Sequence, residues 1–285
     1  MANAIIAYGN QIDTATLSGG SWLSTLPLAN LQDRRLGKLA RTTDDATAST
    51  KFDLDFGGPR LLRVVGLIGH NFSPDALYRI RLSTVADFAT TVADSGWTAV
   101  WPVAYPFGTL PWGSPSWWTG SYSAEDVASY DASTVYVAAT TVSARYMRVE
   151  IDDTTNAAGY VEFGRLFAGD GWQPIRNMVY GAGVGWESRT TVQEALSGAE
   201  SFDVRRSVRI ARFGLEAMTE SEAMAAAYEI QRSMGISGEV LFVWDADDTA
   251  NAPRRRFLGR FRTLSAIENP GPDRWRAPFE IKELL

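Results

Sequence analysis

The stretch between Asp94 and Glu125 carries no charged residue, and it constrains the fold of this 285-residue chain more than any other feature. It holds five of the ten tryptophans and is interrupted repeatedly by proline and glycine. Because proline and glycine disrupt helices and regular strand pairing, residues 95–124 are expected to form a long structured loop. A loop of this length inside a compact domain is usually functional. Its aromatic residues are Trp97, Trp101, Tyr105, Phe107, Trp112, Trp117, Trp118 and Tyr122.

Three interpretations of this aromatic loop are open. The rings form an interface with another protein, stack on the rings of a glycan, or fold back and cap their own domain. A sugar site usually includes a few charged or amide groups that pair with hydroxyls, and the loop has none. The sequence therefore favours protein contact, and glycan binding is the alternative.

Composition excludes several function classes. A formal net charge of −6 argues against nucleic-acid binding, because no excess of cations is present to neutralise phosphates. The chain has no cysteine, which excludes disulfides, thiolate catalysis and cysteine-zinc sites. The single histidine, His70, ends an apolar run with no identifiable nucleophile or acid beside it, so we read it as structural. No enzyme activity, metal or cofactor is expected.

The N-terminal half predicts an all-β domain. Alternating apolar and polar residues at 52–56 and 78–82, an apolar run at 61–67 and a later segment at 144–151 are typical of strands in an antiparallel sandwich or barrel. Gly57-Gly58-Pro59 is expected to turn the chain between two of these strands. Neither a signal peptide nor an apolar run approaching 18 residues is present, so we expect synthesis in a cytoplasm and no membrane span.

A domain boundary is expected at residues 169–172, where glycines separate two patterns. Beyond it, Thr219-Glu-Ser-Glu222 matches a capping box and predicts a helix over 219–234 that ends at Gly235. Strands follow at 239–244, 256–264 and 275–284, with a hairpin tip at 245–253 in which a calcium loop is the weaker interpretation. The second domain, residues 172–285, is therefore predicted to be a β-sandwich or split barrel with one helix.

Residues 1–169 resemble the galactose-binding-like, or discoidin (F5/8 type C), jelly-roll superfamily. The resemblance is carried by the early segment 26–42, by the segment 52–67, and by the closing strands at 145–149 and 162–169. It implies a jelly-roll β-sandwich whose ligands sit on loops at one end. The aromatic segment 95–124 is an insertion relative to that pattern, so no ligand residue of the family carries over. Asn30 and Asp33 could hold calcium in the early loop, as in some relatives, although a site without metal is the preferred interpretation.

Residues 172–285 resemble the ring-forming β modules of the tail tube and distal tail proteins of long-tailed phages. The resemblance rests on the order strand, helix, strand, long hairpin and terminal strand, the last at 275–283. It implies a virion structural protein of a bacteriophage tail tip or baseplate that is assembled in the host cytoplasm. Such a distal tail protein would form a homo-oligomeric ring, hexameric or trimeric, and would dock other tail proteins or host-surface carbohydrate during host attachment. A stand-alone carbohydrate-binding protein is the alternative.

Two arginine-rich strips in the second half are the candidate subunit interface. Acidic residues balance them across the chain, so ion pairs between subunits fit them better than a nucleic-acid groove does. The residues are Arg205, Arg206, Arg209, Arg212, Arg254, Arg255 and Arg256.

Overall fold

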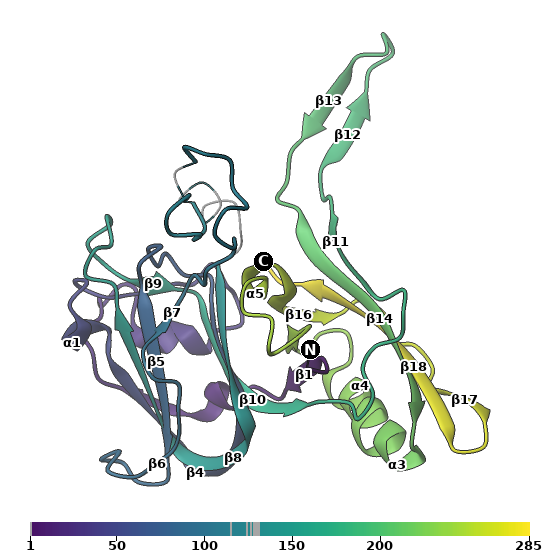
Figure 1. Cartoon of the computed structure of the whole chain (residues 1–285), viewed down its shortest axis with the longest axis horizontal. Coiled ribbons are helices and arrows are strands. Elements are labelled where there is room, and N and C mark those ends of the chain that lie inside the picture. Colours follow the sequence, from purple (N-terminus) through teal and green to yellow (C-terminus); the bar gives the residue numbers. More distant parts are fainter. Residues whose placement is uncertain (1, 115, 124, 126, 128–131) are drawn as a thin grey trace. The chain divides into compact units, whose positions relative to one another are not determined.

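The computed structural model describes every residue except 1, 115, 124, 126 and 128–131 (Figure 1). The chain forms two compact units: Met1–Gln173 with Leu241–Phe257, and Pro174–Val240 with Leu258–Leu285. The mainly β class expected from the sequence is the class observed in both. The chain first passes from the first unit to the second after Gln173, next to the boundary expected at 169–172. The sequence pattern gives no signal for the return of Leu241–Phe257 to the first unit.

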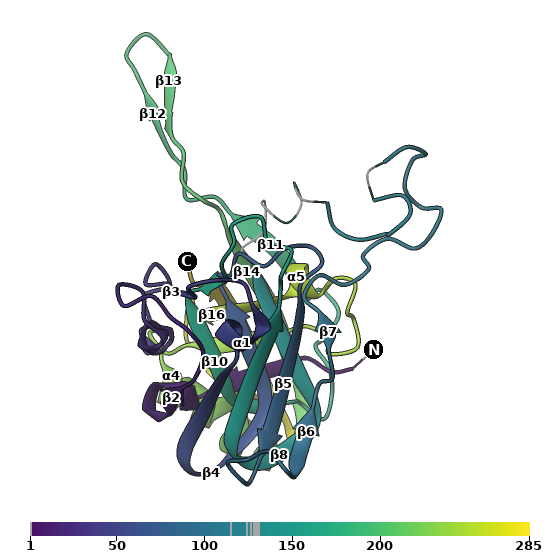
Figure 2. The ribbon, with the colours of Figure 1, turned by 90° about the vertical axis from the view of Figure 1, so that its left-hand side faces the viewer.

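Two long antiparallel strands, β4 (Phe52–Ile68) and β8 (Ser133–Asp152), organise the first unit. The first half of β4 pairs with β2 and with the second half of β8, which also pairs with β5. The second half of β4 pairs with β10 and with the first half of β8. The two strands therefore belong to both layers of a sandwich, a corner that bulges make possible. Figure 2 shows β4, β8 and β5 running side by side.

The corner lies where the sequence predicted a turn. That prediction is wrong, because the chain continues through Gly57-Gly58-Pro59 as one strand whose register with β8 shifts between Asp55 and Arg60. Gly57 has a φ of +73°, a conformation that glycine adopts at low cost, and its N–H donates to Asp55 Oδ1 at 2.8 Å. The result is a bulge in place of a hairpin.

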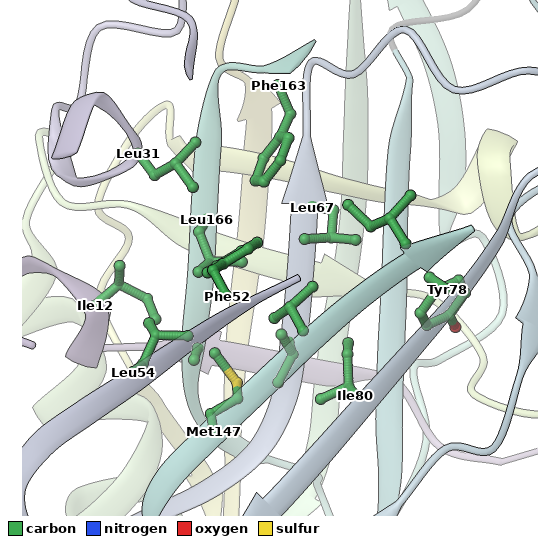
Figure 3. Packing of buried hydrophobic residues seen from close by; sticks show 14 of the residues in the cluster. Ile12, Leu31, Phe52, Leu54, Leu67, Tyr78, Ile80, Met147, Phe163 and Leu166 are labelled. Atoms are coloured by element: carbon green, nitrogen blue, oxygen red, sulfur yellow. The ribbon is translucent and has the colours of Figure 1, made fainter. Parts of the chain in front are cut away.

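Alternation along β4 separates the core from the surface. Phe52 and Leu54 point into a buried cluster shared with Met147 of β8, and Figure 3 shows these side chains converging. On the outer face the Asp53 carboxylate pairs with Arg148, with a closest N–O distance of 2.5 Å. Three further ion pairs cross this layer: Arg145–Asp55, Arg81–Glu150 and Arg79–Asp94.

The other elements of the first unit complete the layers and connect them. β3 pairs with β9 outside the two main layers. The bounds are β1 (Ile5–Tyr8), η1 (Gln11–Thr14), β2 (Thr16–Ser18), η2 (Leu28–Gln32), β3 (Ala40–Arg41), α1 (Thr47–Thr50), β5 (Leu77–Ser83), β6 (Thr91–Asp94), β7 (Thr98–Ala99), β9 (Glu162–Phe163), β10 (Arg165–Trp172), β15 (Val240–Val243) and α5 (Ala252–Arg255).

The second unit is an antiparallel sheet in which β14 (Val208–Met218) pairs with β11 and β18. Phe213 of β14 stacks on Phe279 of β18 at a centroid distance of 5.5 Å, and both side chains are buried. The remaining bounds are β11 (Gly183–Glu187), β12 (Thr191–Glu194), β13 (Glu200–Asp203), β16 (Arg256–Phe261, which crosses from the first unit), β17 (Glu268–Gly271) and β18 (Arg274–Glu283).

The helix predicted over 219–234 is present as one continuous helical segment: α3 (Glu220–Glu222), a π-helical turn η3 (Ala223–Tyr228) and α4 (Glu229–Met234). Thr219 Oγ1 accepts the Glu222 N–H at 3.2 Å, as a capping box requires. The Glu222 carboxylate instead accepts the N–H of Ile175 at 2.9 Å, so it ties the preceding loop to the helix. Gly235 ends the segment with a φ of +54°.

A buried ion pair joins β14 to β18 in the second unit. The side chains of Arg209 and Glu283 are 2% and 3% exposed, and Arg209 Nε donates to Glu283 Oε1 at 2.8 Å. Glu283 also accepts the backbone N–H of Arg209. Removing either partner leaves a buried charge without its counterion, whereas replacing both with apolar groups removes the problem.

We expect Glu283→Gln to lower the free energy of unfolding of the second unit by about 3–5 kcal/mol. The double variant Arg209→Met/Glu283→Leu should recover most of this loss. Urea unfolding followed by circular dichroism measures both. A loss below about 1 kcal/mol for Glu283→Gln would contradict the assigned role of the pair.

His70 is buried just beyond β4, where its ring stacks on Phe72 at a centroid distance of 4.0 Å. Its Nε2 lies 2.9 Å from Thr134 Oγ1. Burial lowers the pKa of His70 to about 3, so the ring is neutral and unsuited to act as a base on an external substrate. This agrees with the structural role expected for it.

The folded pKa of His70 lies below the value of about 6.5 expected for the unfolded chain, so only the unfolded chain gains this proton as the pH falls below 6.5. The free energy of unfolding should therefore fall between pH 6.5 and 5, by up to about 1.4 kcal/mol per pH unit. His70→Gln should lack this slope. NMR titration of the single imidazole offers a direct check, and a midpoint near 6.5 would rule out the buried neutral state.

Candidate functional site

The base of the aromatic loop belongs to the core of the first unit. Trp101 and Tyr122, at opposite ends of the loop, are 4% and 2% exposed and meet edge to face at 5.8 Å. Trp101 Nε1 donates to the carbonyl of Phe72 at 3.4 Å, and the Tyr122 hydroxyl donates to the carbonyl of Ala250 at 2.8 Å. These two rings therefore pack against their own domain, as the third interpretation of the loop expected, and they anchor the loop.

Just beyond this anchor the two sides of the loop are held together at Gly120. Its carbonyl accepts the N–H groups of Ala104 and Tyr105 at 2.9 and 3.0 Å. Gly120 has a φ of +62°, and a Cβ at this position would lie 2.4 Å from the Tyr105 carbonyl oxygen. Only glycine fits this backbone approach, so the anchor and the outer part of the loop are joined by a fixed neck.

Beyond the neck, four rings form a cluster that we call the aromatic tip: Phe107, Trp112, Trp117 and Trp118. Trp112 meets Trp117 edge to face at 5.2 Å and Trp118 at 6.2 Å, and Phe107 lies 6.0 Å from Trp117. Phe107, Trp112 and Trp118 are 76%, 79% and 75% exposed, whereas Trp117 is half-buried among them. The tip therefore presents large apolar surfaces to solvent in a mutually supported arrangement.

Local turns hold the tip in shape. Thr109 Oγ1 donates to the Pro106 carbonyl and Ser114 Oγ to the Pro111 carbonyl, each at 2.7 Å. Beside Trp118 the hydroxyls of Thr119 and Ser121 lie 2.7 Å apart. Residues 95–124 carry no charged side chain, so a ligand on the tip would meet neutral polar groups such as these hydroxyls.

Two other predicted rings lie outside the tip. Tyr105 packs on Tyr122 at 6.3 Å, and its hydroxyl accepts a bond of 3.4 Å from Arg254. Trp97, near the start of the loop, is 45% exposed. Seven of the eight aromatic residues identified in the sequence thus divide between an anchor, a neck and an exposed tip, and Trp97 lies outside all three.

The seven arginines predicted at a subunit interface differ in their burial and in their partners. Arg209 is buried against Glu283. Arg256 is 6% exposed; its guanidinium donates to the carbonyls of Val135 and Ala246, and burial lowers its pKa. Each of these two therefore has partners within its own unit. Of the others, Arg205 pairs with Asp203, Arg212 with Glu280 and Arg255 with Asp248; Arg206 is exposed and Arg254 half-buried.

No group of three or more His, Asp or Glu side chains within the described residues could hold a metal ion. Asn30 donates to the carbonyl of Leu39, and Asp33 pairs with Arg35 and Lys38, so the early loop is held by these contacts. Asp248 at the 245–253 hairpin binds the side chains of Asn251 and Arg255. None of the helices in the described part of the chain is long and apolar enough to cross a membrane.

No family model matches the sequence, and no curated protein matches it. Among solved structures, the chain is similar to the family 32 carbohydrate-binding module of NanJ from Clostridium perfringens in complex with galactose (12% identity, TM-score 0.38, covering 58% of this chain and 99% of that one). It is also similar to the lectin binding domain of lectinolysin complexed with Lewis b (13%, 0.39, 57% and 97%). A third is chitosan-binding module 1 of a chitosanase/glucanase from Paenibacillus sp. IK-5 (13%, 0.35, 57% and 100%).

Proposed function

We propose that this chain is a non-catalytic carbohydrate-binding protein whose ligand stacks on the aromatic tip. The observation that carries the proposal is the exposure of Phe107, Trp112 and Trp118 on a loop whose base is fixed in the core. An exposed indole face matches the apolar C–H face of a pyranose ring. The anchor and neck fix this surface before a ligand arrives, which lowers the entropy cost of binding.

A tip without charged side chains can still bind a sugar, although the binding is weak. The hydroxyls of Thr119 and Ser121 and the carbonyls of the loop can pair with sugar hydroxyls next to the stacked ring. Contact between a sugar face and an aromatic ring removes apolar surface from water, which contributes about 25 cal/mol per Å². Stacking on Trp112 and Trp118 therefore supports a weak, face-selective interaction, which repeated copies of the sugar on a surface would strengthen.

The double variant Trp112→Ala/Trp118→Ala should lose at least tenfold in affinity for the glycan that the chain binds best. Titration of the full chain with soluble galactosides, glucosamine oligomers and fucosylated oligosaccharides, read by calorimetry, identifies that glycan and measures the loss. Trp186→Ala is the matched control, because Trp186 is also exposed but lies on β11 of the second unit. Equal affinity of the double variant and the natural chain, or no binding to any of these sugars, would refute the proposal.

A second candidate function is that of a structural subunit in a phage tail tip or baseplate. It is favoured by a separate observation: the hairpin of β12 and β13 in the second unit exposes Val192 and Phe202, at 52% and 57%, as proteins built for assembly do. The same double variant separates the two functions. Loss of sugar binding with normal assembly supports the carbohydrate proposal, whereas loss of assembly without any sugar phenotype supports the aromatic tip as a protein interface.

A further inference from the structure

The second unit has a groove of about 380 Å³ on the solvent face of its sheet. Its floor is formed by Gly214 of β14 and Pro278 of β18, which lie directly opposite each other, and Figure 1 shows the two strands side by side. The neighbouring Phe213 and Phe279 are buried, so the two floor residues face the other side of the sheet. Because glycine and proline have no long side chain, the floor stays low and leaves a volume typical of small-molecule sites.

A turn that precedes β11 forms one wall of the groove. The N–H of Val179 in this turn donates to the carbonyl of Gly214 at 3.0 Å. Pairing between β11 and β14 begins at Gly183, so residues 180–182 bulge out of the ladder. Tyr180 is fully exposed on this bulge and lines the groove. Its ring therefore offers an aromatic face on which an apolar face of a ligand can pack.

An ion pair forms another part of the wall. Arg212 and Glu280 lie directly opposite each other on β14 and β18, and Arg212 Nε donates to Glu280 Oε1 at 2.8 Å. The side chain of Arg212 is 62% exposed, and its two terminal nitrogens have no hydrogen-bond partner within the residues that the structure describes. These two nitrogens can therefore bind a carboxylate through two parallel charge-assisted bonds.

The ion pair belongs to a network with one more positive than negative charge. Arg262 pairs with Glu280 and Glu187, at 2.9 and 3.1 Å. Glu187 also pairs with Lys282 at 2.6 Å. Together with Arg212, three cations share two carboxylates, and no further ion pair joins them in the described part of the chain. The charge of the network therefore favours an anionic ligand over a cationic one.

Hydroxyl groups complete the lining of the groove. They belong to Thr263 and Ser265, and neither hydroxyl forms a hydrogen bond among the described residues. A hydroxyl both donates and accepts, as the hydroxyls of a sugar do. The groove thus combines an aromatic ring, neutral hydroxyls and a charged pair, whereas the aromatic tip has no charged group to pair with a sugar.

We propose that this groove is a second binding site, for a sugar that carries a carboxylate, such as a uronic or sialic acid. The sugar ring packs on Tyr180 and Pro278, and its carboxylate binds the terminal nitrogens of Arg212. Thr263 and Ser265 pair with its hydroxyls. The proposal goes beyond the carbohydrate proposal for the aromatic tip and does not depend on it, because every residue of the groove belongs to the second unit.

NMR titration of the isotope-labelled full chain tests the site, in the Trp112→Ala/Trp118→Ala background that removes the aromatic tip. The ligands are methyl glucuronide, N-acetylneuraminic acid and, as the neutral partner of the first, methyl glucoside. At least one acidic sugar should shift the amide signals of residues 180–182 and 212–214. The neutral glucoside should bind about tenfold more weakly than the glucuronide, because it lacks the charge-assisted bonds.

Two variants assign the roles within the groove. Arg212→Gln should remove the preference for the acidic sugar, while Glu280 keeps its pairing with Arg262. Tyr180→Ala should weaken acidic and neutral sugars alike. Arg276→Gln is the matched control, because Arg276 is also an exposed arginine of β18 in an ion pair with a glutamate, outside the groove, and it should change nothing.

Three results would overturn the proposal. They are the absence of shifts in the groove with both acidic sugars, acidic-sugar affinity that Arg212→Gln leaves intact, and equal shifts with acetate at the same concentration, which would show an anion site without sugar recognition. Binding of an acidic sugar in the background that lacks the aromatic tip supports the groove whatever the tip itself binds. The two proposals can therefore fail separately.

Discussion

The first unit depends on the pairing of β4 with β8 through a bulge. A regular pair of strands would lie in one layer and leave its apolar residues uncovered, whereas the shift after Asp55 lets the same two strands enter both layers. Residues from both halves, such as Leu54 and Leu67, then face one cluster. On the outside of this corner, the Asp55 carboxylate accepts the N–H of Gly57, whose φ is positive, and the guanidinium N–H of Arg145.

Aromatic residues have two roles in the aromatic loop: some anchor it in the core and others are exposed to solvent. Trp101 and Tyr122 contribute to the core and have hydrogen-bond partners for their polar atoms, whereas Trp112 and Trp118 keep about three quarters of their surface in water. The neck at Gly120 separates the two sets. This division explains how a stretch without charge can be both well anchored and exposed, because the domain beneath the tip holds the base of the loop.

The alternation of apolar and polar residues, together with the helix-capping signals, predicted strands and a helix that bury one side in a core. The Phe52–Phe56 strand and the Thr219 cap follow from such local rules, and the structure contains both. Gly57-Gly58-Pro59 resembles a turn and forms a bulge, because the pairing of distant residues on β8 decides the outcome. Which aromatic rings are buried and which are exposed depends on the contacts of the loop with Gly120 and Ala250. Local sequence rules do not predict these contacts.

The central claim is that the exposed rings of the aromatic tip bind sugar while the anchoring rings do not take part. NMR spectra of the indole N–H groups, assigned by single substitutions, test it directly during titration with the best-binding glycan. The account predicts shifts for Trp112 and Trp118 and an unchanged Trp101 signal. Shifts confined to Trp101 or to tryptophans outside the loop, or no shift at any ring at saturating sugar, would contradict it.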